Sequence, residues 1–159
     1  MRSILFQSFL RSFRNIFLLN GRASRFDYWA LQVVYGTIFF FALSLTELFF
    51  PSMHYVLDSI EIILGIIGLP LNFSVTIKRL HDLNKTGFYF MLTPIPFINL
   101  FLFIYIGFFS GDIHKNKYGN PVARLSNKME ILDFVWIGLL LLALLCIILS
   151  NIAQPHNMI

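Results

Sequence analysis

Four long hydrophobic segments, separated by short polar stretches, dominate the hydrophobic pattern of this chain. They cover residues 28–50, 55–77, 88–109 and 131–150. An α-helix needs about 20 mostly apolar residues to cross the hydrocarbon core of a bilayer, and each segment has at least that length. We therefore predict an all-α, polytopic membrane helical bundle with four transmembrane helices, forming a single domain over residues 1–159.

The N-terminal stretch 3–19 has a different pattern. At helical spacing, one face collects the apolar side chains Leu5, Phe6, Phe9, Leu10, Phe13, Ile16 and Phe17, while arginine, serine and amide side chains fill the other. This pattern predicts an amphipathic helix that lies in the membrane interface and ends at Asn20-Gly21. A secretory signal peptide is the weaker interpretation, because arginines interrupt the apolar region and no small-residue cleavage site follows it.

Prolines disturb two of the hydrophobic segments. Pro70 lies inside the second, where it predicts a kink. Pro94 and Pro96 lie in the first third of segment 88–109 and predict a broken helix. A re-entrant segment that turns back at these prolines is the alternative to a full crossing. Four spans are favoured, because 22 residues are few for both arms of a hairpin.

Composition supports membrane embedding. Apolar residues make up 57% of the chain and charged residues 13%, whereas soluble domains have about 45–50% and about 25%. The one cysteine, Cys146, lies in a leucine- and isoleucine-rich run, which excludes a disulfide framework. A soluble fold is therefore not expected.

The basic residues indicate orientation. All twelve lysines and arginines fall within residues 2–25, 78–85 and 115–128. This spacing is typical of loops that alternate with membrane spans and not of a nucleic-acid-binding patch. An N-terminus on the cytoplasmic side puts the first two groups inside. Four spans then put the third group outside, whereas a re-entrant third segment keeps all three groups inside.

Three polar motifs flank the hydrophobic segments. They read G-R-x-x-R-x-x-Y-W over 21–29, R-L-H-D-x-x-K-x-G over 79–87 and N-x-Y-G-x-P over 116–121. Together with the paired prolines, they resemble the bacterial inner-membrane family catalogued as domain of unknown function 805, over residues 15–125. The chain departs from the usual pattern at Phe88-Tyr89, where tryptophans are common, and at Lys78, where arginine is common. The resemblance implies a multi-pass protein of the bacterial inner membrane and transfers no catalytic residue, because the family has no established activity.

We expect these motifs to form an interfacial polar cluster. Its candidate members are Arg22, Arg25, Lys78, Arg79, His81, Asp82, Asn116 and Tyr118. In a helix that continues past Ile77, Asp82 is within reach of both Lys78 and Arg79. The favoured interpretation is a structural clamp in which Asp82 pairs with Arg79 and with Arg22 or Arg25. Binding of a lipid headgroup comes second, and a proton-transfer role for His81 comes last.

Asp58 and Glu61 are the candidates for an ion entry site. They are three residues apart at the start of the second hydrophobic segment, so they share one helix face. Ionisable residues within membrane segments are functional candidates. Their position near the expected non-cytoplasmic interface favours a simple interfacial placement over a transport pathway.

No pattern in the chain indicates catalysis, a cofactor or a metal. The four histidines fall in different segments without metal-ligand spacing, and neither a nucleophile elbow nor a phosphate-binding loop is present. We expect a non-enzymatic accessory protein that binds the lipid bilayer, including anionic headgroups, and a membrane protein partner, but no nucleic acid. The alternative is a small transporter or channel component, which at this size implies a homo-oligomer.

Overall fold

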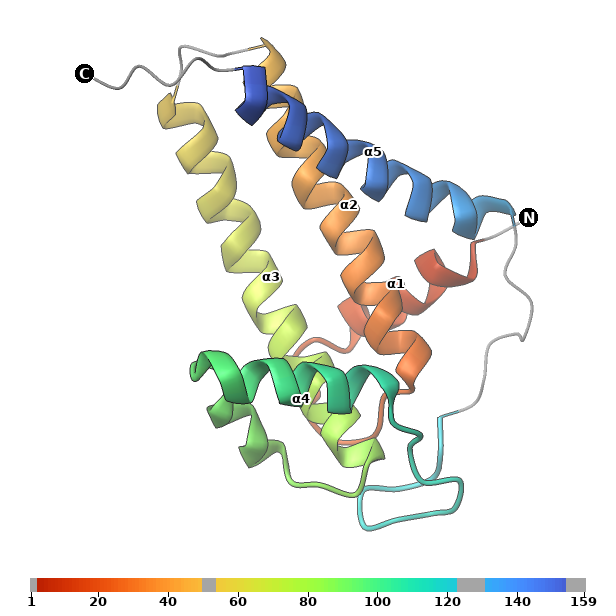
Figure 1. Cartoon of the computed structure of the whole chain (residues 1–159). Coiled ribbons are helices and arrows are strands. Elements are labelled where there is room, and N and C mark those ends of the chain that lie inside the picture. The colour runs from red at the N-terminus through yellow and green to blue at the C-terminus, as the bar shows by residue number, and fades with distance from the viewer. Residues whose placement is uncertain (1–2, 50–53, 123–130, 154–159) are drawn as a thin grey trace.

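The computed structural model describes residues 3–49, 54–122 and 131–153 and is built from helices (Figure 1). In chain order they are α1 (Ile4–Arg14), α2 (Arg25–Phe49), α3 (His54–Asp82), the short 3-10 helix η1 (Gly87–Leu92), α4 (Pro96–Phe108) and α5 (Ile131–Ala153). The described residues contain no strand, and their one isolated bridge joins Asn116 to Gly119. The all-α prediction is confirmed.

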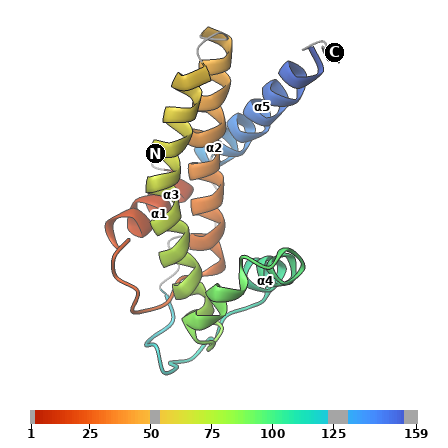
Figure 2. The same ribbon diagram turned by 90° about the vertical axis from the view of Figure 1, so that its left-hand side faces the viewer.

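The antiparallel hairpin of α2 and α3 is the scaffold of the molecule (Figures 1 and 2). Within it, Arg25–Leu45 and Asp58–Asp82 are long and apolar enough to cross a membrane. Between the two helices, the Gln32 side-chain amide donates to Asn72 Oδ1 at 2.8 Å. Such side-chain bonds hold transmembrane helices together where lipid offers no hydrogen-bonding alternative.

Helix α1 ends earlier than its hydrophobic pattern predicts. Ser3 caps its start, but the helix ends at Arg14 instead of continuing to residue 19. At this end α1 contacts α3, where the carbonyl of the C-cap residue Asn15 accepts a hydrogen bond from Lys78 Nζ at 2.7 Å. The chain then leaves the helix through a turn in which Leu18 N donates to Asn15 O at 3.1 Å. A local periodicity could not show this long-range contact.

The third hydrophobic segment is interrupted where its prolines predict. The 3-10 helix η1 ends at Leu92, and α4 begins at Pro96, a position that suits proline because the first helical residue needs no N–H donor. Helix α4 has 13 residues, or about 20 Å of helix, less than the roughly 30 Å of hydrocarbon in a bilayer. It lies across the α2–α3 hairpin (Figures 1 and 2). The full crossing expected over residues 88–109 is therefore not formed by a continuous helix.

Helix α5 packs along α2, with Ala143 buried in the contact. Its start is fastened to α1 by Asp133, which is fully buried. The Asp133 carboxylate accepts a hydrogen bond from Ser3 Oγ at 2.6 Å and another from Leu5 N at 2.9 Å. It therefore supplies acceptors at the N-terminus of α1, where backbone N–H groups lack helical partners.

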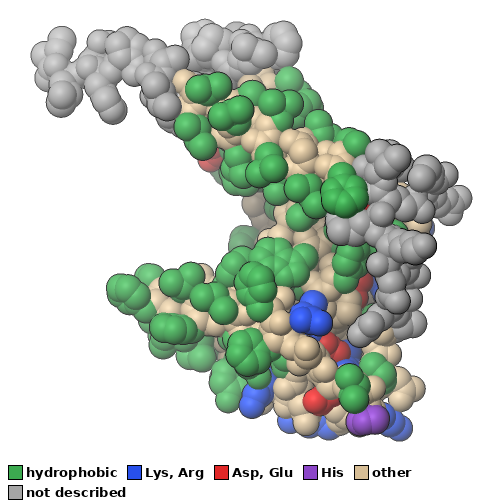
Figure 3. All heavy atoms as spheres, turned by 45° about the vertical axis from the view of Figure 1, so that its right-hand side comes forward, with side chains coloured by type: hydrophobic (Ala, Val, Ile, Leu, Met, Phe, Trp, Pro, Cys, Tyr) green, Lys and Arg blue, Asp and Glu red, His purple; other side chains and the backbone are tan. Residues whose placement is uncertain are grey.

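Polar and apolar side chains separate along the molecule. Figure 3 shows hydrophobic side chains over the upper part of the molecule and over an arm that projects to the left. Lysine, arginine, acidic and histidine side chains gather at the lower end. Most of the exposed large hydrophobic side chains belong to α3, α4 and α5. Such a surface suits lipid around the helices and water or headgroups at the charged end.

Candidate functional site

The site is centred on Asp82, the last residue of α3. Its Oδ1 accepts from Arg22 Nε at 2.9 Å and lies 2.8 Å from Arg22 Nη2, while its Oδ2 pairs with Arg79 Nη1. The Arg22 and Arg79 side chains are 1% and 0% exposed. One buried carboxylate thus holds two buried guanidinium groups, an arrangement called the Asp82 clamp below.

Arg22 also fastens the chain that follows α4. Its Nη1 donates to His114 O at 2.8 Å and, at 3.3 Å, to Gly119 O, while its Nη2 donates to Asp112 O. The backbone adds a further link, from Asp112 N to Asp82 O at 2.8 Å. Residues 112–119 are therefore held on the same end of the molecule as the start of α2.

Side chains bind four carbonyls at the C-terminal end of α4. Its last carbonyls accept from Arg79 Nε (Ile106 O, 2.9 Å), Trp29 Nε1 (Gly107 O, 2.9 Å), Arg25 Nη1 (Phe108 O, 3.0 Å) and Arg79 Nη2 (Phe109 O). These carbonyls have no partners within the helix, and the negative end of the helix dipole favours cations. The arginines thus satisfy these backbone carbonyls, and the carbonyls in turn offset part of the positive charge of the arginines.

His81 is covered rather than free. Its Nδ1 lies 3.1 Å from Gly21 O, and its ring stacks on Tyr118 with 3.7 Å between centroids and 7° between planes. The side-chain amide of Asn116 donates to the carbonyl of His81 at 2.9 Å. The third polar motif thereby packs onto the end of α3.

The structure brings together six of the eight residues predicted for the polar cluster: Arg22, Arg79, His81, Asp82, Asn116 and Tyr118. The predicted Arg79–Asp82 pair is present, and Arg22 is the second partner. Arg25 binds the end of α4 instead. Lys78, which the spacing places within reach of Asp82, donates its ammonium hydrogen bond to Asn15 O instead.

Two carboxylates with clear structural roles were not singled out from the sequence. Asp133 is one. The other is Asp27, which forms a reciprocal cap with Ser24: Asp27 N donates to Ser24 Oγ at 3.1 Å, and Ser24 N donates to Asp27 Oδ2 at 3.0 Å. Ser8 Oγ also donates to Asp27. The serine and the acid three residues later form a capping-box pattern that could have identified this site.

A polar cavity of about 810 Å³ opens beside the Asp82 clamp. Its lining includes the cations Arg11, Arg25 and Arg79, the carboxylates Asp27, Asp82 and Asp112, and the apolar side chains Trp29, Phe108 and Ile113. Arg25 is exposed and uses one of its several N–H groups on Phe108 O. Arg11 lies 3.7 Å from Asp27 and is 35% exposed. The cavity therefore offers guanidinium donors that the fold has not consumed.

The predicted ion entry residues lie away from this site. Asp58 and Glu61 are near the start of α3, at the opposite end of that helix from Asp82, and both are exposed. Neither lines the polar cavity. Among the residues that the structure describes, no group of three or more His, Cys, Asp or Glu side chains could hold a metal ion.

Comparison with known proteins identifies a family and several relatives. A family model described as "Protein of unknown function (DUF805)" matches residues 16–120, a range that includes every residue of the Asp82 clamp. The inner membrane protein YhaI of Escherichia coli K12 is 29% identical over 126 residues, covering 76% of this chain and 99% of YhaI. The inner membrane protein YhaH of the same strain is 29% identical over 112 residues, covering 70% of this chain and 92% of YhaH. No solved structure matches.

Proposed function

Because the chain belongs to the DUF805 family of proteins of unknown function, we propose that it is a non-enzymatic accessory protein of the bacterial inner membrane that binds an anionic phospholipid headgroup at its cytoplasmic face. The relatives are inner membrane proteins, which supports the location. The observation that carries the proposal is the polar cavity beside the Asp82 clamp, where Arg25 keeps N–H groups available.

The state of the clamp supports binding rather than catalysis. A catalytic acid or base must come within hydrogen-bonding distance of its substrate. Arg22, Arg79 and Asp82 are buried and bonded to one another and to the backbone, and Tyr118 covers the ring of His81. These groups act as a fixed wall. The accessible arginines of the cavity can bind a ligand through charge and hydrogen bonds without reacting with it.

A phosphate headgroup fits the donors that remain. Guanidinium groups bind phosphate oxygens through paired, charge-assisted hydrogen bonds. Arg25 is the first residue of the first membrane-spanning helix, which places it at headgroup depth. Basic residues near an anionic leaflet each contribute about 1 kcal/mol of attraction. The Trp29 ring beside the cavity is typical of the same interfacial layer.

We further propose an orientation with the N-terminus in the cytoplasm and a re-entrant third segment. Both ends of segment 87–109 lie near the end of α3: Asn84 and Lys85 precede it, and Phe109 accepts from Arg79. The loop at 110–122 then shares a face with Arg22. This arrangement keeps the basic stretches on one side, as the positive-inside rule favours, and leaves α2, α3 and α5 as the crossings.

Cysteine labelling of membrane-bound protein tests this orientation. In a Cys146→Ala background, we expect Asn84→Cys and Lys117→Cys to be protected from an impermeant maleimide in spheroplasts and to be labelled after the membrane is opened. Both native side chains are exposed, so protection would reflect the membrane. Tyr55→Cys, at the other end of α3, should be labelled in intact spheroplasts. Labelling of position 117 but not 84 from outside would instead support four spans.

Replacement of Arg25 tests the headgroup site. We expect Arg25→Gln to weaken binding of phosphatidylglycerol about tenfold, or ~1.4 kcal/mol, measured by mass spectrometry of lipid retained on protein purified from mixed micelles with phosphatidylcholine. Arg14→Gln is the matched control. Arg14 is exposed at the end of α1 and does not line the cavity, so this substitution removes the same charge from outside the site. Equal losses in the two variants would indicate a general charge effect and contradict a headgroup site at Arg25.

The transporter alternative rests on Asp58 and Glu61. Both side chains are exposed on α3, and neither lines the polar cavity. A homo-oligomer would be needed to enclose them. Since the cavity and its available cations lie at the other end of the hairpin, binding is the function that the geometry favours.

A further inference from the structure

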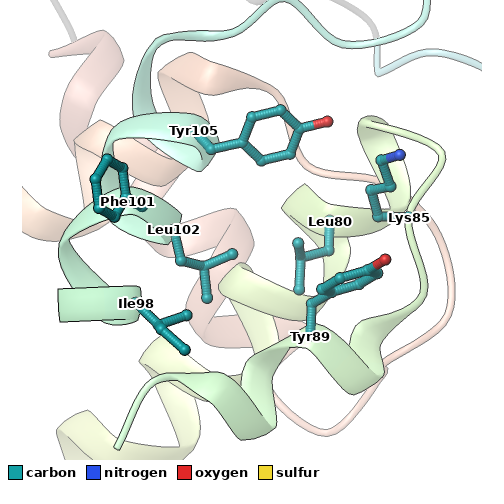
Figure 4. Close-up of a pocket in the computed structure, with 7 residues that line it drawn as sticks. All are labelled: Leu80, Lys85, Tyr89, Ile98, Phe101, Leu102 and Tyr105. Carbon is teal, nitrogen blue, oxygen red and sulfur yellow. The ribbon is translucent and has the colours of Figure 1, made fainter. Parts of the chain in front are cut away.

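A second pocket lies between the end of α3, η1 and α4 (Figure 4). Its volume is about 410 Å³, and it is lined by Leu80, Lys85, Tyr89, Ile98, Phe101, Leu102 and Tyr105. That volume lies within the range of about 300–1,000 Å³ typical of small-molecule sites. Only Lys85 among the lining residues carries a formal charge.

The pocket is divided into a polar and an apolar end. Figure 4 shows the Lys85 ammonium and the hydroxyls of Tyr89 and Tyr105 directed toward the same side of the pocket, away from Ile98 and Leu102. None of these polar groups makes a hydrogen bond with another residue that the structure describes. An ammonium and two hydroxyls that converge without partners form a donor set suited to an anion.

The apolar end is built by the break in the third hydrophobic segment. Because the chain turns between Leu92 and Pro96, α4 runs back across the end of α3. Side chains of α4 and Leu80 of α3 line the same pocket (Figure 4). Leu80 is 0% exposed and Leu102 is 8% exposed, so they form a fixed floor. Ile98 and Phe101 are exposed at the rim. Such walls offer contacts to a hydrocarbon chain and none to a polar ligand.

The position of the pocket in the membrane favours an amphiphilic ligand over a water-soluble anion. Lys85 follows the end of α3 by a few residues, so its ammonium belongs to the headgroup layer, where lysines keep their charge hydrated while their stems lie on apolar surface. The apolar end lies against α4, which is hydrophobic along its length. One molecule that spans both ends must carry an anionic head and a hydrocarbon chain.

We infer that this pocket binds one anionic phospholipid, with its phosphate on Lys85, Tyr89 and Tyr105 and one acyl chain along Leu80, Ile98 and Leu102. The site is separate from the polar cavity of the proposed function, with no lining residue in common. It does not depend on that proposal. A phosphate is favoured over a carboxylate because it has more oxygens that can accept hydrogen bonds from ammonium and hydroxyl donors.

A photoreactive lipid tests the inference. The probe is phosphatidylglycerol with a diazirine near the end of one acyl chain, in phosphatidylcholine nanodiscs that contain the full chain. We expect crosslinks at residues 98–102, suppressed by excess unlabelled phosphatidylglycerol but not by phosphatidylcholine. Crosslinks spread evenly over α4 and α5, without such competition, would overturn the inference. A free fatty acid that competes better than phosphatidylglycerol would also overturn it.

Variants separate the two ends of the pocket. Lys85→Gln should lower specific crosslinking about tenfold, while Lys115→Gln, the removal of an exposed charge outside the pocket, should leave it unchanged. Ile98→Trp should block the chain and lower crosslinking while leaving the melting temperature near that of the native protein. Arg25→Gln should leave this signal intact, so either site can fail without the other. Equal effects of Lys85→Gln and Lys115→Gln would contradict a role for Lys85.

Discussion

Replacing Asp82 by alanine is expected to lower the free energy of unfolding by about 3–5 kcal/mol, the range for removing one partner of a buried ion pair. The Asp82 carboxylate holds both Arg22 and Arg79, and neither guanidinium is more than 1% exposed. Without it, two buried cations face each other with backbone carbonyls as their only acceptors. Chemical unfolding of the purified protein in mild detergent, followed by circular dichroism, measures the effect.

Asp112→Ala is the control for this substitution. Asp112 is exposed, and its carboxylate accepts a hydrogen bond from Asn116 Nδ2 at 3.2 Å. An exposed interaction of this kind contributes about 0–1 kcal/mol. A double-mutant cycle with Arg79→Met then measures the coupling to Asp82. The loss in the double variant should be smaller than the sum of the single losses, and additive losses would show that the two residues do not interact.

Gly111→Ala is expected to destabilise the protein by about 1–3 kcal/mol, as overpacking of a filled site does. A Cβ at position 111 would collide with the carboxylate of Asp82 and lie 3.0 Å from Arg79 Nη1. These groups cannot easily move aside, because each is held by several hydrogen bonds. Unfolding under the same conditions measures the loss.

Gly138→Ala provides the comparison for Gly111→Ala. Gly138 lies within α5, and a Cβ there meets no atom within 4 Å. Alanine in a helix interior is favoured over glycine by about 1 kcal/mol, so this variant should be as stable as the native protein or more so. If Gly111→Ala were equally stable, the close approach of the 110–119 loop to Asp82 would be contradicted.

Much of the site follows from sequence spacing. Residues three apart on a helix are neighbours, and this predicts the Arg79–Asp82 pair that the structure contains. The choice between Arg22 and Arg25 does not follow from spacing, because both lie at the start of the same helix. It depends on how the chain turns at Gly21, which has a φ of 99°, and on the bond from Ala23 N to Lys78 O.

The contacts between the arginines and backbone carbonyls could not be predicted from the sequence, for a different reason. Many acceptors of the site are backbone carbonyls, in residues such as Ile106, Phe109 and His114. Every residue has a carbonyl, so no residue type marks these positions. The prolines at 94 and 96 likewise indicated a break without giving the direction in which the chain continues. In the structure, Arg25 and Arg79 bind the C-terminal end of α4 and hold it beside the end of α3.

The long reach of Arg22 has a consequence for how the protein is made. Its partners Asp82, His114 and Gly119 lie 60, 92 and 97 residues further along the chain. During synthesis the α2–α3 hairpin is therefore complete before the loop that satisfies its charged end has been made. Closure of the clamp is a late step of biogenesis. A nascent chain that stops before residue 112 carries Arg22 without its backbone acceptors.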